Sequence, residues 1–105
     1  MDVDLTREAQ KMVAAAYKEY LEKRKAGVSK ANAKLFSEDE LYNKYFKSML
    51  LADYDETVRE MCRAFGCKMY INGGFMLSDD AIIYMENRFK NGITDTLSFL
   101  AQFIP

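Results

Sequence analysis

Two arginines spaced by one helical turn are the strongest candidates for chemistry in this sequence. Arg59 and Arg63 are four positions apart, so on a helix both guanidinium groups point to the same side. Such groups donate hydrogen bonds to phosphates and to guanine edges, which makes the pair a candidate DNA contact. Asp55, Glu56 and Glu60 lie on the same stretch and would face the same polyanion. The alternative is therefore a solvated helix face whose opposite charges pair with one another.

A second group of cations lies in the first third of the chain. Residues 1–34 carry eight basic and five acidic side chains, residues 35–60 carry three and seven, and residues 61–105 carry four of each. A DNA-binding domain needs a basic surface for phosphate contacts, and only the first third offers one. The candidate phosphate contacts, called here the basic set, are Lys18, Lys23, Arg24, Lys25, Lys30 and Lys34. An alternative role for its central run is to complement the dipole at a helix C-terminus.

The acidic middle of the chain favours a different kind of partner. Negative side chains attract a basic protein and imitate the polyanion that such a protein binds. The candidates for this role, called here the acidic set, are Glu38, Asp39, Glu40, Asp53, Asp55, Glu56 and Glu60. DNA binding and protein binding therefore both remain open.

Enzyme chemistry finds little support in the composition. The chain has no histidine, which excludes Ser–His and Cys–His pairs and imidazole metal ligands. Cys62 and Cys67 are too far apart for a zinc half-site, and we expect the first on a buried helix face and the second near the start of a hairpin. Asp79 and Asp80 are typical acidic residues of a first helical turn. We therefore expect no enzymatic activity, no metal and no cofactor.

Helical patterns and caps predict the elements that position these residues. Apolar residues at helical spacing predict a helix over residues 6–25, capped by Asp4 or Thr6, and a short helix over residues 30–35 capped by Ser29. A capping box over residues 37–40 opens a third helix that runs to about Leu50.

The most informative stretch combines a helix, a tight hairpin and another helix. Asp53 is expected to cap a helix over residues 54–66, which Gly66 ends, and a hairpin over residues 68–77 turns at Asn72 and Gly73. C-terminal helices follow over residues 78–104. This order predicts a mostly α-helical single domain over residues 1–105 with a small β-hairpin. We interpret it as a winged helix-turn-helix with an extra helix, in which residues 54–66 form the recognition helix and residues 68–77 the wing.

Two stretches carry a resemblance to a known group. Residues 77–92 and residues 17–30 resemble small uncharacterised bacterial and prophage proteins of winged-helix type. The resemblance implies a winged-helix fold and brings no assigned activity with it. Because the winged-helix fold most often binds DNA, we expect a non-enzymatic, DNA-binding module like those of transcription regulators, of bacterial or prophage origin. The alternative is an adaptor, or a phage-encoded inhibitor of a nucleic-acid-binding host protein.

An apolar face near the C-terminus indicates a further contact. In the expected last helix this wide face either packs back on the first helix or pairs with a second copy, as we expect for a homodimer. The candidate interface residues are Leu97, Leu100, Phe103 and Ile104. The acidic start of the chain does not resemble a signal peptide, and no apolar run is long enough to span a membrane, so we expect a cytoplasmic protein without membrane contact.

Overall fold

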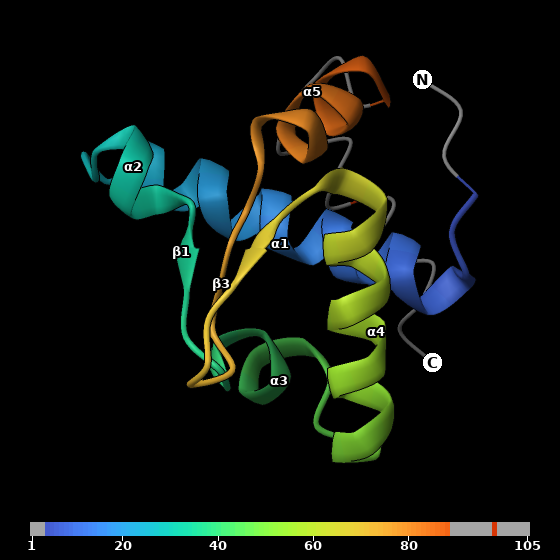
Figure 1. Ribbon diagram of the computed structural model, residues 1–105. Coiled ribbons are helices and arrows are strands. Elements are labelled where there is room, and N and C mark those ends of the chain that lie inside the picture. Colours follow the sequence, from blue (N-terminus) through green and yellow to red (C-terminus); the bar gives the residue numbers. More distant parts are fainter. Residues whose placement is uncertain (1–3, 89–97, 99–105) are drawn as a thin grey trace.

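Helices dominate the structure and surround one small sheet (Figure 1). The computed structural model describes residues 4–88 and Ser98. Within this part of the chain the elements are, in order, α1 (Arg7–Lys25), α2 (Lys30–Ala33), β1 (Leu35–Phe36), α3 (Glu40–Tyr45), α4 (Leu51–Phe65), β2 (Lys68–Met69), β3 (Phe75–Met76) and α5 (Asp79–Arg88). The mostly α-helical fold with a small sheet is confirmed.

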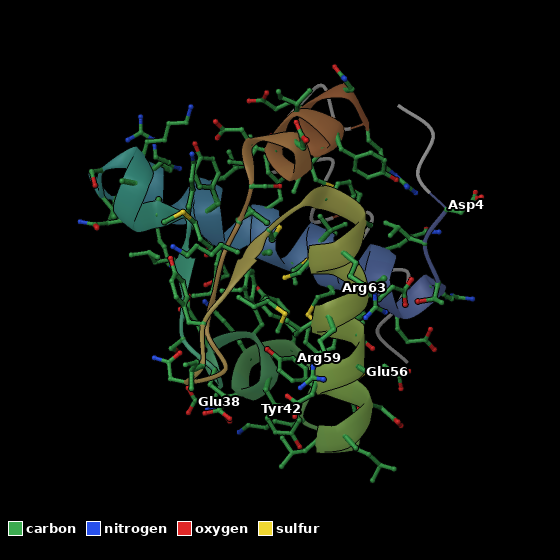
Figure 2. The ribbon with its side chains drawn as sticks, viewed as in Figure 1. Asp4, Glu38, Tyr42, Glu56, Arg59 and Arg63 are labelled. Carbon is green, nitrogen blue, oxygen red and sulfur yellow. The ribbon has the colours of Figure 1, made fainter. Side chains whose placement is uncertain are left out.

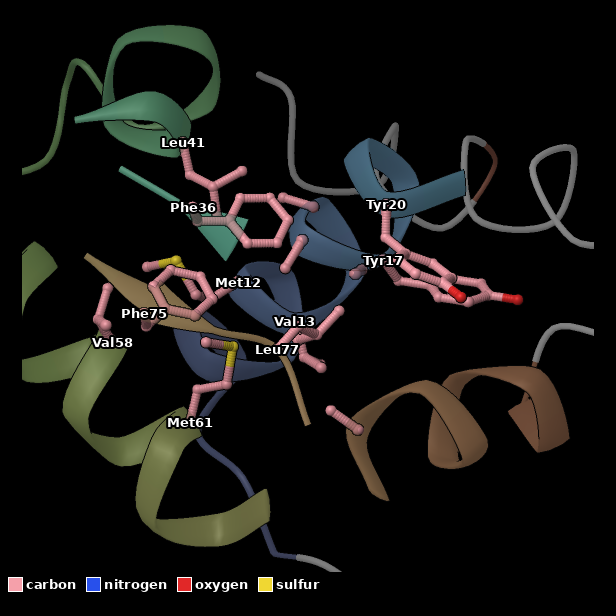
Figure 3. Close-up of a cluster of buried hydrophobic side chains, with 14 of the residues drawn as sticks. Met12, Val13, Tyr17, Tyr20, Phe36, Leu41, Val58, Met61, Phe75 and Leu77 are labelled. Carbon is pink, nitrogen blue, oxygen red and sulfur yellow. The ribbon is translucent and has the colours of Figure 1, made fainter. Parts of the chain in front are cut away.

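The helix α1 forms the centre of the molecule. It contacts α2, α3, α4 and α5, and its buried face includes Met12, Val13 and Tyr17. Side chains from α4 and β3 pack on this face, among them Met61 and Phe75 (Figure 3). The predicted amphipathic stripe therefore becomes the core on which the other helices are arranged.

Thr6 fixes the start of α1 and also joins it to α4. Its hydroxyl oxygen accepts a hydrogen bond from the Ala9 backbone N–H at 3.2 Å, as an N-cap does. The Thr6 hydroxyl and backbone N–H each donate to the Glu60 carboxylate at 2.8 Å. Of the two predicted caps, Thr6 is thus the one used, and Glu60 holds the cap in place.

Removing this cap should lower stability measurably. We expect Thr6→Ala to reduce the free energy of unfolding by about 1–2 kcal/mol, because the helix cap and the hydroxyl bond to Glu60 are lost while the backbone N–H bond to Glu60 remains. Urea unfolding followed by circular dichroism measures this. Thr6→Ser keeps the hydroxyl and serves as the matched control. Equal stability of the two variants would contradict a capping role.

The sheet is antiparallel, with strand order β1-β3-β2. Phe36 of β1 pairs with Phe75 of β3, and their rings stack at a centroid distance of 4.9 Å. The short strand β1 corrects the predicted helix over residues 30–35, which ends at Ala33. The physical reason is long-range: Leu35 and Phe36 find their partners on β3, and Leu77 donates its backbone N–H to the Lys34 carbonyl at 2.8 Å.

The predicted hairpin is confirmed at its turn. Gly73 has a φ of +90°, and its N–H donates to the Tyr70 carbonyl at 3.0 Å. The Asn72 side chain accepts a hydrogen bond from the Gly74 N–H at 3.0 Å. A Cβ at Gly74 would lie 2.6 Å from the Phe36 carbonyl oxygen, so the turn requires glycine there as well.

The boundaries around α3 and α4 differ from the prediction. The third helix ends at Tyr45 instead of Leu50, because the Tyr42 hydroxyl donates to the Met49 carbonyl at 3.2 Å and closes a loop there. The helix α4 begins at Leu51, so Asp53 lies in its first turn and does not cap it.

The capping box over residues 37–40 is only half formed. The Ser37 backbone N–H donates to the Glu40 carboxylate at 3.4 Å, as the motif predicts. The Ser37 hydroxyl instead donates to the Asp39 carboxylate at 3.3 Å, and Asp39 occupies the N-cap position without a side-chain bond to the helix. The returning bond of a complete capping box is therefore replaced by a local side-chain contact.

The C-terminal prediction can be followed only as far as α5. The Ser78 hydroxyl oxygen accepts a hydrogen bond from the Ala81 backbone N–H at 3.1 Å. The helix α5 therefore begins at Asp79, directly after Ser78, as the sequence predicts. Apart from Ser98, the expected last helix lies outside the described residues, and so do its four candidate dimer residues, Leu97, Leu100, Phe103 and Ile104.

Candidate interaction surface

The outer face of α4 carries exposed charged candidates of both signs (Figure 2). The helix is strongly amphipathic, and its inner face, which includes Tyr54, Val58 and Met61, is buried against the core. Arg59 and Arg63 are exposed on the outer face, one turn apart. The helix therefore presents the two guanidinium groups together, as their spacing indicated.

Acidic side chains occupy the first half of the same helix. Asp53, Asp55 and Glu56 are all exposed there. Charge thus changes along α4, from negative near its N-terminus to positive near its C-terminus. A partner that lies along the whole helix would meet both signs of charge.

A groove of about 420 Å³ separates α4 from the hairpin. Asp55 and Arg59 line one side of it, Ile71 lines the hairpin side, and Glu38 approaches from the loop before α3. The Glu38 side chain lies against Gly73, since a Cβ on that glycine would be 2.7 Å from Glu38 Cγ. Acidic groups therefore converge on the groove from two elements that are distant in sequence.

Apolar side chains are exposed close to this acidic region. Leu50 and Leu51 at the start of α4 are 72% and 61% exposed, and Ile71 at the hairpin turn is fully exposed. Leu51 is one turn before Asp55 on the same side of α4. The surface thus combines negative charge with unburied leucine and isoleucine side chains, and we call these residues, with Glu38, Asp55 and Glu56, the acidic–apolar surface.

Lys18 of the basic set is held inside the molecule. Its ammonium group donates to the Tyr45 hydroxyl at 2.7 Å and pairs with Glu22 at 3.0 Å, and its side chain is 12% exposed. Burial lowers its pKa, but the bonds to Tyr45 and Glu22 outweigh this and raise the pKa above the ordinary lysine value. Lys18 is charged, yet its charge is committed to neighbours.

Lys23 is engaged even more completely. Its ammonium group donates to the Leu35 carbonyl at 2.9 Å, pairs with Glu40 at 2.8 Å and lies 4.1 Å from the centre of the Phe36 ring. These contacts connect α1 with β1 and with the start of α3. The structure thus gives Lys23 a role in holding the fold together.

The remaining cations of the basic set are divided. Lys34 pairs with Asp79 and is mostly buried, and the pair with Lys34 lowers the pKa of that aspartate. Arg24 donates to the Val28 carbonyl at 3.1 Å but is exposed, as are Lys25 and Lys30. Three members of the basic set are thus exposed and three are half-buried in intramolecular pairs.

The acidic set loses fewer members to internal contacts. Glu40 pairs with Lys23, and Glu60 accepts both hydrogen bonds from Thr6. Asp39 accepts a hydrogen bond from the Ser37 hydroxyl at 3.3 Å but remains exposed. The exposed members, Glu38, Asp39, Asp53, Asp55 and Glu56, lie before or within the first half of α4.

A buried polar cluster between α1 and α3 was not predicted. The carboxylate of Glu19, with 8% of its side chain exposed, accepts hydrogen bonds from Lys44 at 2.9 Å and from Tyr45 at 2.7 Å. Burial raises the pKa of Glu19, but these bonds outweigh it and lower the pKa. Burial, with a further contribution from Glu19, raises the pKa of Tyr45 to about 12. The sequence does contain a signal for the burial of Glu19: it is seven positions after Met12 and so lies on the buried stripe of α1.

Both cysteines lie where the sequence placed them. Cys62 is buried on the inner face of α4, and the half-buried Cys67 immediately precedes β2. Both thiols are free. Among residues 4–88 no three histidine, cysteine or carboxylate side chains form a group that could hold a metal ion. The described helices include none long and apolar enough to cross a membrane.

Comparisons with known proteins give no relative from which a role could be transferred. No protein-family model, no curated protein and no solved structure matches this chain. The function of the surface on α4 and the hairpin must therefore be argued from its geometry and its charge.

Proposed function

We propose that this chain is a non-enzymatic winged-helix module that binds a basic protein through its acidic–apolar surface. The order of α1, β1, α3, α4, β2 and β3 supports the winged-helix assignment, as does the strand order β1-β3-β2. In this assignment α4 is the recognition helix, the hairpin is the wing, and α2 is the extra helix, which precedes β1.

The intramolecular contacts of three lysines in the basic set are the main reason to propose a protein partner instead of DNA. Phosphate contacts need accessible positive side chains. Lys18, Lys23 and Lys34 are instead engaged in pairs within the molecule. Using them for DNA would break these contacts and their links to neighbouring elements. In the groove between α4 and the hairpin, the carboxylates of Glu38 and Asp55 outnumber the Arg59 guanidinium and would repel a polyanion.

The exposed apolar side chains favour a protein over a small cation. Leu50, Leu51 and Ile71 lose contact with water only when another apolar surface covers them. A protein that carries lysine or arginine side chains around an apolar centre would complement them and the neighbouring carboxylates. Such complementarity raises the rate and the specificity of association. Proteins that bind nucleic acid have this kind of basic surface.

DNA binding is the second candidate, and one observation favours it. Arg59 and Arg63 are exposed on the helix that a winged-helix protein inserts into the major groove. Arg24, Lys25 and Lys30 could add phosphate contacts from the other end of the molecule. Titrations with a basic peptide and with a DNA duplex can therefore separate the two candidates.

Titrations with two model ligands test the proposal. We expect a short synthetic peptide of alternating arginine and leucine to shift the amide NMR signals of the first half of α4 and of the hairpin. The double variant Asp55→Lys, Glu56→Lys should weaken this binding at least about tenfold, which corresponds to 1.4 kcal/mol. Glu86→Lys changes an exposed carboxylate of α5 and is the control. Thermal unfolding of each variant shows whether it is folded.

The outcomes distinguish the candidates. If the peptide does not bind, or binds equally to the double variant and the control, the acidic–apolar surface is not the interface. If a DNA duplex binds instead, its affinity should fall steeply with salt. Arg59→Gln with Arg63→Gln should then reduce this DNA binding, which would establish the second candidate in place of the first.

A further inference from the structure

The turn after α4 brings the two cysteines together. Gly66 ends the helix with a φ of +67°, a conformation that reverses the direction of the chain. The Cys67 backbone N–H then donates to the Cys62 carbonyl at 3.0 Å. This backbone bond places the two cysteines side by side at the end of α4. The side chains of both cysteines line the same groove.

The start of α5 stabilises negative charge on Cys67. The Ser78 backbone N–H donates to the Cys67 sulfur at 3.3 Å. The Ser78 hydroxyl donates to the Phe65 carbonyl at 2.7 Å and accepts from the Cys67 thiol at 3.5 Å. The hydrogen bond from Cys62 lowers the pKa of Cys67, burial raises it, and Ser78 lowers it again, so that the net pKa is below the ordinary value. The bond to Cys67 and burial raise the pKa of Cys62. The two thiols thus differ in reactivity.

A groove makes the pair reachable from solvent. It has a volume of about 380 Å³ and is lined by both cysteines together with Arg59, Arg63, Gly66 and Met69. The two arginines are exposed, so a small oxidant can approach the sulfur of Cys67 past positive charge.

We propose that Cys62 and Cys67 form a redox-active dithiol site, which hydrogen peroxide converts into an intramolecular disulfide with Cys67 as the attacking thiol. The site adjoins the groove between α4 and the hairpin at Arg59 but contains none of the residues of the acidic–apolar surface, and the proposal does not depend on which partner that surface binds.

The chemistry takes place in two balanced steps. The Cys67 thiolate attacks one oxygen of hydrogen peroxide, the O–O bond breaks, and the leaving hydroxide takes up a proton to become water. Cys67 is now a sulfenic acid. The sulfur of Cys62 then attacks the sulfur of Cys67, the S–O bond breaks, and the hydroxide leaves as water with the proton of Cys62. Peroxide is reduced to two waters, and two thiols are oxidised to one disulfide.

The experiment treats the full chain with hydrogen peroxide and follows it by intact mass and thiol labelling. We expect the monomer to lose two hydrogen atoms in mass and both labelling sites. In Cys62→Ser the oxidation should stop at a sulfenic acid on Cys67, which dimedone traps. In Cys67→Ser the remaining thiol should react at least about tenfold more slowly, since only a thiolate attacks efficiently.

Two further measurements separate this site from an ordinary cysteine. The rate of Cys67 alkylation should rise with pH around a midpoint below that of the same protein unfolded in urea. Cys62→Ala removes the hydrogen-bond donor and should move this midpoint upward more than Cys62→Ser, which keeps a hydroxyl donor. Formation of disulfide-linked dimers only, no reaction with peroxide, or equal midpoints in the folded and unfolded protein would each overturn the proposal.

Discussion

Glu19→Ala is expected to lower the free energy of unfolding by about 3 kcal/mol. Removing one partner of a buried ion pair leaves the other charge without compensation, and such losses are typically 3–5 kcal/mol. Here the Tyr45 hydroxyl and the Lys18 ammonium, 12% exposed, lose a carboxylate at 2.7 and 3.5 Å. Lys44 also donates to this carboxylate, but 52% of its side chain is exposed, so water compensates part of its loss and the expected effect lies at the lower end of that range. The bonds from Tyr45 and Lys44 also join α1 to α3. Urea unfolding at neutral pH measures the effect.

Glu22 provides a matched control one turn further along α1. It pairs with Lys18 at 3.0 Å and lies 4.0 Å from Lys44, but 42% of its side chain is exposed. Solvent-exposed ion pairs contribute roughly 0–1 kcal/mol, so Glu22→Ala should cost no more than that. If both alanine variants lost the same small amount, burial of Glu19 would not be the source of its importance.

The pH dependence of the Glu19 effect has a definite sign. Its pKa is lower in the folded protein than in the unfolded chain, where a glutamate titrates near about 4.3. The stability that it contributes is therefore fully present above that pH and is lost as the pH falls through the folded pKa. The difference in unfolding free energy between wild type and Glu19→Gln should shrink as the pH is lowered from 6 toward about 3. A constant difference would contradict this.

Elements with strong local signals could be predicted from the sequence. The helix α1 has a regular apolar stripe and a threonine cap, and the hairpin has glycines where its turn requires them. The start of α4 could not be predicted in the same way. Asp53 has the residue type of a cap, but the Tyr42 hydroxyl bonds to the Met49 carbonyl and fixes the chain earlier. That contact joins α3 to the following loop and leaves no pattern in the local sequence.

The strand β1 shows a second limit. Two residues are too short to show the alternation by which a strand is recognised. Phe36 becomes part of a strand because Phe75, far along the chain, pairs with it and stacks on its ring. Local propensity extended the preceding helix instead, and the tertiary contact overrode it.

The sequence indicated where some of the candidate residues lie, but not which of their charges are free to meet a partner. The spacing of Arg59 and Arg63 correctly indicated one exposed helix face. Nothing in the sequence near Lys23 reveals that Glu40 and the Phe36 ring engage its charge in the folded protein. A count of cations along the chain therefore overstates the positive surface that a polyanion could use.

Phe75→Ala should be the most destabilising single change in the sheet, with a loss of about 3–5 kcal/mol. The ring is 1% exposed, stacks on Phe36 and lies near Met12 and Val58 in the core (Figure 3). Because β3 is the central strand of the sheet, loss of the Phe75 ring would also weaken the packing of β1 and β2 beside it. A cavity left at this position would be bordered by side chains of α1, α4 and β1 (Figure 3).

Two companion variants show whether the cavity is responsible. Phe75→Leu leaves a smaller cavity and should cost less than Phe75→Ala, whereas Ile71→Ala at the exposed hairpin turn should change stability by no more than about 0.5 kcal/mol. Urea unfolding at neutral pH compares all three with wild type. A loss below about 1 kcal/mol for Phe75→Ala would contradict the central place of this ring, because even an average substitution costs about that much. A large loss for Ile71→Ala would instead show that the hairpin turn itself supports the core.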